Sequence, residues 1–108
     1  MPGTLASGGN ILYAWLIGPV LTPVSVAANT TAEQLFSVPG VQLYDNVSGY
    51  LLAPQINGIG ISNMRVSAPG QLQIGFSNST AGALVPTAGL YQICICRPEA
   101  LPLPTTAG

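Results

Sequence analysis

The chain has no histidine and no lysine, and only five of its 108 residues carry a formal charge at neutral pH. These are Glu33, Asp45, Arg65, Arg97 and Glu99. A soluble domain usually has about a quarter of its residues charged, which hydrates its surface and keeps copies apart. With a net charge of -1, repulsion between copies of this chain is weak. We interpret the shortage as a surface meant to be covered; a monomer solvated by its Ser, Thr, Asn and Gln side chains is the alternative.

The missing residue types exclude most catalytic chemistry. Without histidine there is no Ser-His-Asp or Cys-His arrangement and no imidazole metal site. Without lysine there is no Schiff base and no phosphate-binding P-loop. The three carboxylates lie in separate segments with no motif around them, so we expect solvated charges rather than a glycosidase pair. We therefore expect no enzyme, no catalytic residue, no cofactor and no metal.

Nucleic-acid and membrane partners are also disfavoured. Two arginines and a pI near 4.7 cannot neutralise a phosphate backbone. The most apolar run, residues 11–17, is stopped by Gly18-Pro19 well short of the roughly 20 residues that span a bilayer. No basic residue precedes that run, as a signal peptide would require. We expect a protein made and used in a cytosol-like compartment.

The two cysteines lie in one apolar segment. Cys94 and Cys96 are two residues apart, so on a strand both side chains would point to the same face. They lack the further cysteine or histidine that a metal site needs, and a local disulfide would be strained. We expect them to act as small apolar residues.

The chain pattern is that of a β-protein. Glycine (13) and proline (10) are frequent, which provides chain reversals and interrupts helices. The length suits one domain with a modest core. About seven or eight short strands are separated by turn signals. We predict an all-β fold: an antiparallel β-sandwich of the jelly-roll or Ig-like type, or else a closed barrel.

Three segments carry this prediction. Leu72, Ile74 and Phe76 alternate with polar or small residues and are predicted to point into the core. Residues 90–96 are apolar on both faces apart from one glutamine, which indicates a central strand. Residues 20–26 alternate too, and are predicted to place Val20, Thr22, Val24 and Val26 on one face of an edge strand that contains Pro23.

We divide the chain into three parts. Residues 1–19 form an apolar N-terminal arm or a first strand, residues 20–97 the β-sandwich domain, and residues 98–108 an extended Pro-rich C-terminal tail. The prolines of the tail prevent it from joining a helix or a strand ladder.

Several segments, taken in order, resemble a small β-domain of tailed-bacteriophage virion proteins. They are Val-Ser-Val-Ala-Ala-Asn-Thr-Thr-Ala-Glu-Gln at 24–34, Val-Pro-Gly at 38–40, Gly-Ile-Gly-Ile-Ser-Asn-Met-Arg-Val-Ser-Ala at 58–68, Leu-Gln-Ile-Gly-Phe-Ser-Asn-Ser-Thr-Ala-Gly-Ala at 72–83 and Pro-Thr-Ala-Gly-Leu-Tyr at 86–91. The order is more specific than any one piece. Residues 44–50 are more polar and aromatic than the pattern has there, and the residues before 19 have no counterpart.

The domains that the chain resembles are capsid decoration, or cement, proteins. The resemblance implies a non-enzymatic virion structural protein that binds the outer surface of the phage head and stabilises contacts between major capsid subunits. It further implies a homotrimer on the capsid exterior, assembled in the host cytoplasm, with the major capsid protein as partner. The alternative is a receptor- or carbohydrate-binding β-sandwich of a tail fibre or spike, using Tyr44, Tyr50 and neighbouring amide side chains.

Interface residues are expected at both ends of the chain. An extended terminus can add a strand to the sheet edge of a neighbour, and aromatic side chains dominate interface energetics. The candidates are Tyr13, Trp15, Leu16, Ile17, Leu101 and Leu103, with Arg65 and Arg97 as candidates for an ion pair between subunits. The alternative for residues 13–17 is that they fill the core of their own domain as a first strand.

Overall fold

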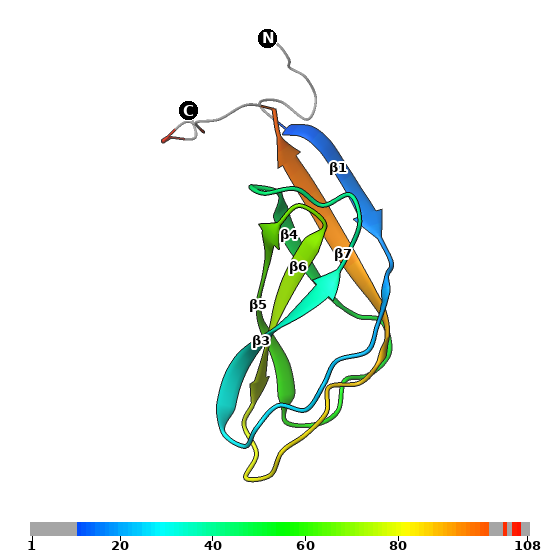
Figure 1. Cartoon of the computed structure of the whole chain (residues 1–108), viewed down its shortest axis with the longest axis vertical. Helices are drawn as coiled ribbons and strands as arrows, with labels where there is room; N and C mark the ends of the chain where they lie inside the picture. Colours follow the sequence, from blue (N-terminus) through cyan, green and yellow to red (C-terminus); the bar gives the residue numbers. More distant parts are fainter. Residues whose placement is uncertain (1–10, 100–102, 104, 107–108) are drawn as a thin grey trace.

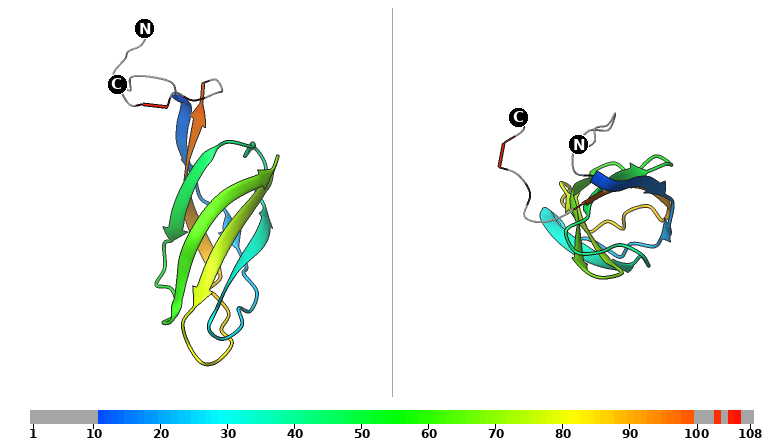
Figure 2. Two further views of the ribbon diagram at one scale, coloured as in Figure 1. Left: turned by 90° about the vertical axis from the view of Figure 1, so that its left-hand side faces the viewer. Right: turned by 90° about the horizontal axis from the view of Figure 1, so that it is seen from above.

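Two antiparallel sheets pack against each other in the computed structural model, which describes residues 11–99, 103 and 105–106 (Figures 1 and 2). The strands are β1 (Ile11–Ile17), β2 (Val20–Leu21), β3 (Thr30–Ser37), β4 (Asn46–Leu51), β5 (Ile59–Ala68), β6 (Gln71–Asn78) and β7 (Gly89–Pro98). None of the described residues is helical, so none belongs to a helix that could span a bilayer. The all-β prediction is confirmed, and the arrangement is consistent with a β-sandwich.

The first sheet is built around β7. Strand β4 pairs with one side of β7, while β1 and β2 follow one another along its other side. The central position predicted for residues 90–96 is therefore confirmed. Residues 11–17, for which an arm and a first strand were both open, form β1 and pair with β7.

The second sheet has β6 between β3 and β5. The side chains of Leu72, Ile74 and Phe76 are fully buried, as their alternation predicted. Strand β5 carries two irregularities in its pairing with β6, between Ile61 and Asn63 and between Val66 and Ala68. Such bulges bend a strand and raise its twist.

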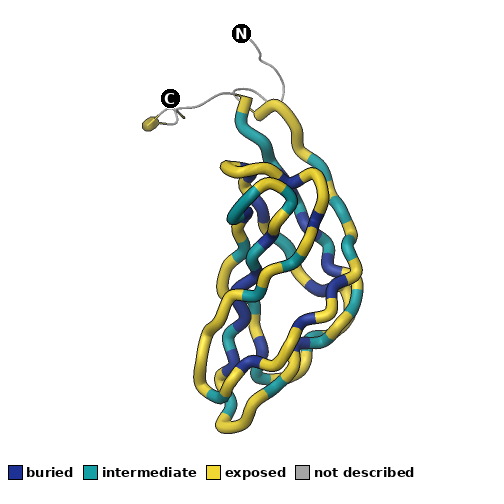
Figure 3. The backbone as a smooth tube through the Cα atoms, viewed as in Figure 1, coloured by how far each residue is buried: buried dark blue, intermediate teal, exposed yellow. Residues whose placement is uncertain are grey.

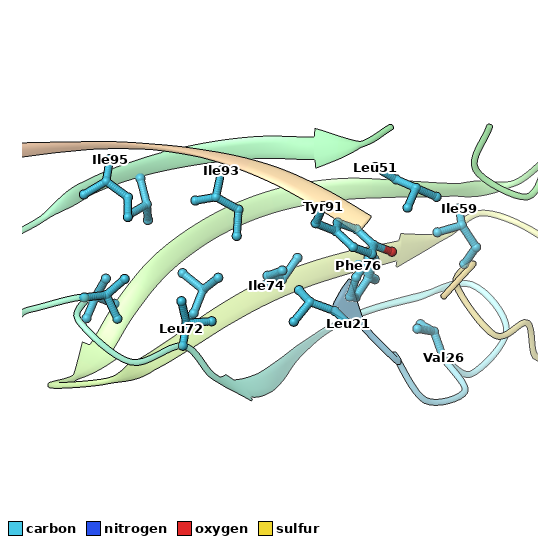
Figure 4. Packing of buried hydrophobic residues seen from close by; sticks show 14 residues of the cluster. Leu21, Val26, Leu51, Ile59, Leu72, Ile74, Phe76, Tyr91, Ile93 and Ile95 are labelled. Atoms are coloured by element: carbon cyan, nitrogen blue, oxygen red, sulfur yellow. The ribbon is translucent and has the colours of Figure 1, made fainter. Parts of the chain in front are cut away.

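The core lies between the two central strands (Figure 4). Leu72, Ile74 and Phe76 of β6 pack with buried side chains of β7, among them Tyr91 and Ile93. The rings of Phe76 and Tyr91 meet edge to face, with centroids 6.5 Å apart. Full burial of one such apolar side chain contributes about 1.5–3 kcal/mol. The two central strands therefore hold the sheets together.

The buried Tyr91 hydroxyl has polar partners in two loops. It donates to the Thr87 carbonyl at 2.8 Å and lies 3.4 Å from the Gln55 side-chain amide nitrogen. The Gln55 carbonyl oxygen accepts from the Thr87 N–H at 2.6 Å. Burial raises the pKa of Tyr91, so the hydroxyl keeps its proton and donates. This network ties the loop after β4 to the loop before β7.

Residues 20–26 differ from their prediction. Only Val20–Leu21 is strand, and Leu21, Pro23 and Val26 are the buried side chains, whereas Val20 and Val24 are 74% and 65% exposed. Pro23 has no N–H for a ladder, so the chain leaves the first sheet there. Val26 then exchanges backbone hydrogen bonds with Leu84.

The connection from β6 to β7 crosses between the sheets and is organised by a buried asparagine. The Asn78 side chain donates to the carbonyls of Val26 and Gly82, at 3.0 and 2.9 Å, and accepts from the N–H and hydroxyl of Thr80. A buried amide with all these partners avoids the cost of an unpaired polar group. It holds the crossover in one conformation.

Candidate interaction surface

The outer face of the first sheet carries no charged side chain among the described residues. Because Tyr91, Ile93 and Ile95 point inward, alternate residues of β7 and the residues paired with them point outward. We call this surface the uncharged face; it comprises Ile11, Ala14, Leu16, Val20, Asn46, Ser48, Tyr50, Leu90, Gln92, Cys94, Cys96 and Pro98.

Large apolar side chains project from the uncharged face. Val20 is the most exposed of them, and Leu16 and Tyr50 are 60% and 56% exposed. Ile11 and Leu90 are exposed as well. Several large apolar side chains exposed on one face of a sheet make that face a candidate interaction surface.

The outer face of the second sheet is polar by contrast. Arg65 on β5 reaches across β6 to Glu33 on β3, with both nitrogen–oxygen distances 2.8 Å. Gly75 of β6 lies beneath this ion pair. The side chains of Asn63 and Ser62 lie so close to it that a Cβ at Gly75 would collide with both. The Arg65 hydrogen bonds lower the pKa of Glu33, so this exposed pair stays charged at neutral pH. The two faces of the sandwich are therefore chemically different.

Arg97 lies at the inner side of the first sheet, near the end of β7. Its guanidinium binds the Asp45 carboxylate and donates to the Gly40 carbonyl at 2.9 Å. It also lies 5.1 Å from the Trp15 ring centroid and 5.9 Å from that of Tyr13, within cation–π range. Arg97 thus joins β1, β7 and the loop before β4.

Asp45 corrects the expectation that all three carboxylates are solvated. Its side chain is only 1% exposed, because Arg97 covers it and the Gln42 N–H donates to it at 2.9 Å. Hydrogen bonds from Arg97 lower the pKa of Asp45, although burial opposes them. Its pairing could not be read from the sequence, since Arg97 is 52 residues away.

The apolar candidates of the N-terminal segment divide between core and surface. Trp15 and Ile17 pack against the core, whereas Tyr13 and Leu16 are exposed. The rings of Tyr13 and Trp15 touch edge to face at 5.6 Å. Figure 3 shows β1 as a largely exposed strand beside the more buried β7. The segment is thus a first strand of its own domain, in which Trp15 and Ile17 contribute to the core; an interface role for Tyr13 and Leu16 stays a prediction.

The remaining interface candidates are spread over the molecule. Arg65 and Arg97 are both occupied by ion pairs within the chain and lie on different sheets. Leu103 is exposed and lines an apolar hollow of about 190 Å³ with Ile11, Tyr44, Asn46, Cys96 and Pro98. Leu101 lies outside the described residues. The seven candidates within the described residues therefore do not form one site.

The thiols belong to the uncharged face, which the sequence had not singled out as an interface. Cys94 and Cys96 are free and half-buried. Burial, together with neighbouring Cys94, raises the pKa of Cys96, which makes it a poor nucleophile. The described residues contain no group of three or more His, Cys, Asp or Glu side chains that could hold a metal ion.

Comparisons with known proteins give no relative for this chain: no family model, no curated protein and no solved structure matches it.

Proposed function

We propose that the chain is a non-enzymatic structural protein of a tailed-bacteriophage virion, which binds the outer surface of the head and stabilises contacts between major capsid subunits. The observation that carries the proposal is the uncharged face. It offers apolar side chains, amides and hydroxyls on a rigid sheet. Its central strand, β7, is anchored in the core by the buried side chains of Tyr91, Ile93 and Ile95.

We infer the capsid as partner from the resemblance to decoration proteins. We infer an apolar contact from the side chains of the uncharged face. Without charges of its own, the face fits an uncharged apolar surface on the capsid and gains free energy by removing apolar area from water. The opposite sheet, with the Glu33–Arg65 pair, then faces solvent. A small sandwich of jelly-roll or Ig-like type, placed in many copies, would act as a clamp between neighbouring subunits.

Binding to heads can be tested with two matched substitutions. Gln92 and Gln73 are both half-buried, and each occupies the outer face of the central strand of its sheet. Gln92→Glu places a charge in the middle of the uncharged face, and Gln73→Glu does so on the polar face. With assembled, expanded heads that lack the protein, we expect co-sedimentation of the wild type and of Gln73→Glu, and at least a tenfold loss of affinity for Gln92→Glu.

Two results would contradict the proposal. A wild-type protein that fails to sediment with heads removes the capsid partner. If Gln92→Glu and Gln73→Glu bind heads equally well, the capsid is still the partner, but the uncharged face is not the surface that contacts it. Free capsid subunits, which lack the assembled surface, should not bind.

The alternative, a saccharide-binding sandwich, rests on Tyr44. This residue is 70% exposed, has a positive φ of 71° and stands beside Asn46 at the apolar hollow. A non-glycine residue held in that conformation is often functional. Tyr50, however, lies near the other end of β4, four residues and roughly 13 Å along the strand from Asn46, too far to stack on the same sugar ring. Binding to a glycan array that Tyr44→Ala abolishes would favour this function over head binding.

A further inference from the structure

The outer edge of β1 is the least protected strand edge of the described chain. Strand β1 pairs with β7 on one side only. Edge strands present unpaired N–H and C=O groups, which natural proteins cover or distort. Strand β3 carries the charged Glu33, which discourages edge pairing, and its Gln34 side chain binds the N–H and the C=O of Val24 at 2.8 and 2.7 Å. Strand β5 is bulged twice and lies next to β4.

Strand β1 has few of the features that discourage pairing. It contains no proline, no glycine and no charged residue over its seven positions. Its one bulge, between Ile11 and Tyr13, lies at its beginning, so the segment from Tyr13 to Ile17 is regular. Five of its seven residues are exposed, although six are large and apolar or aromatic. Exposed apolar edges of this kind associate with another strand.

The sequence of β1 identifies that other strand. Ile-Leu-Tyr-Ala-Trp-Leu-Ile reads almost the same in both directions about Ala14, with an aromatic residue on either side of the alanine and then leucine and isoleucine. In an antiparallel pair centred on Ala14, Tyr13 of one copy stands opposite Trp15 of the other. Leucine then meets leucine, and isoleucine meets isoleucine. Every cross-strand pair is apolar, and aromatic pairs of this kind stabilise a sheet by about 0.2–1 kcal/mol each.

We propose that β1 pairs with β1 of a second copy, antiparallel and with a two-fold axis at Ala14, so that two first sheets join into one. A symmetric contact of this type requires a self-complementary surface, which the near-palindrome provides. Other registers leave strand residues unpaired or place side chains on opposite faces. The chain's net charge of -1 opposes the approach of a second copy only weakly.

The axis stands perpendicular to the sheet, so the uncharged faces of both copies point the same way. The contact does not depend on head binding, because it uses an edge rather than a face. It differs from the homotrimer that the resemblance implies, since a two-fold contact alone closes as a dimer.

The mass of the purified full chain gives the first test. Native mass spectrometry and light scattering should find a particle of twice the chain mass of 11.0 kDa. Dilution should shift the emission of Trp15, the only tryptophan, as the dimer separates. A monomer at all concentrations, or a trimer, would overturn the proposal.

Charge substitutions at the axis give the second test. Ala14 is exposed and would face its own copy, so Ala14→Lys puts two like charges opposite each other. We expect at least a tenfold weaker dimer for Ala14→Lys and for Ala14→Glu, and recovery when the two are mixed. The control is Leu35→Lys, at an exposed position of edge strand β3, which should leave the dimer intact. A dimer unaffected by Ala14→Lys, or no recovery between two folded variants, argues against the axis.

A cross-link keeps the test valid even if the charged variants do not fold. In a background of Cys94→Ser and Cys96→Ser, Ala14→Cys places two thiols at the axis within the distance that a disulfide spans. Oxidation by Cu(II)-phenanthroline, which takes up the two electrons while two protons are released, should give a covalent dimer. Leu35→Cys in the same background should stay monomeric in denaturing gels. Equal cross-linking at the two positions would mean random collision and no β1 contact.

Discussion

Arg97 and Asp45 form a two-pronged ion pair, with Nε 2.8 Å from Oδ1 and Nη2 2.9 Å from Oδ2. The carboxylate is buried, and the guanidinium is also held by Gly40 and by the aromatic rings of β1. Removal of one partner of a buried pair leaves the other charge without compensation. This pair therefore fixes the loop before β4 and the part of β1 around Tyr13 and Trp15 at the same time.

The two arginines should differ in their effect on stability. Arg97→Ala leaves Asp45 buried and uncompensated, so we expect a clear fall in the thermal midpoint and in the urea midpoint. Arg65→Ala removes an exposed pair, whose contribution is small. Differential scanning calorimetry of both variants checks the order. Equal losses would mean that the burial of Asp45 has no energetic consequence.

Acid should weaken the fold through Asp45. Hydrogen bonds from Arg97 hold its pKa below the ordinary 3.8 in the folded chain, so protonation favours the unfolded chain. The contribution of the pair is fully present above about pH 5 and is lost as the pH falls through 3.8 to the folded-state pKa. Urea unfolding between pH 7 and pH 2.5 measures this decline.

Two amide variants separate the carboxylates in that experiment. Asp45→Asn should be less stable at neutral pH and should lose less on acidification. Glu33→Gln is the control: the pKa of Glu33 is lowered by Arg65, but the group is exposed, so the acid profile should stay close to that of the wild type. A wild-type acid profile in Asp45→Asn would locate the sensitivity elsewhere.

The Tyr91 hydroxyl should matter although its ring packs in the core. Tyr91→Phe keeps the contact with Phe76 but leaves the Thr87 carbonyl without its donor. Because this hydrogen bond is only partly buried, we expect its loss to cost about 0.5–1.5 kcal/mol, which chemical denaturation resolves. Tyr50→Phe, on the exposed uncharged face, should change the free energy of unfolding by less than about 0.5 kcal/mol. A neutral Tyr91→Phe would mean that another donor reaches Thr87.

Gly49 in β4 should not tolerate a side chain. A Cβ there would come within 2.3 Å of the Gln92 carbonyl oxygen and 3.1 Å of the Ile93 Cα, both backbone atoms of β7. Gly49→Ala should destabilise by about 1–3 kcal/mol, because the two strands must separate. Gly60→Ala in β5 is the matched control, since no atom lies within 4 Å of its Cβ position. Similar denaturation midpoints for the two variants would contradict the close approach.

The sequence predicted the elements better than it predicted the surface. Period-two alternation identified β6, and the apolar run of residues 90–96 gave β7 its central place, because burial leaves a direct record in residue type. The same alternation gave a wrong prediction of one strand over residues 20–26, because alternation does not show where a chain leaves its sheet. Pro23 is the available signal, but a proline is also expected within an edge strand and so does not by itself show that the strand ends.

The candidate site required pairing information that no single segment contains. The uncharged face arises only when β1, β4 and β7 are set in register, which brings Leu16, Cys94 and Ser48 side by side. The partners of Arg97 and Arg65 are likewise distant in sequence. The near-palindrome of residues 11–17 is visible in the sequence. The sequence does not show, however, that β1 pairs on one side only, and the near-palindrome favours self-pairing only at such an edge.

Four of the five charged side chains are paired within the chain, which determines how contacts made by the uncharged face or by β1 depend on salt. Glu99 is the one charged side chain in residues 11–99 outside the two ion pairs. A contact made by the uncharged face or by β1 thus offers dissolved ions almost nothing to screen. Such a contact is stabilised by the water released when apolar area is buried, so we expect its affinity to change little with ionic strength and to increase on mild warming.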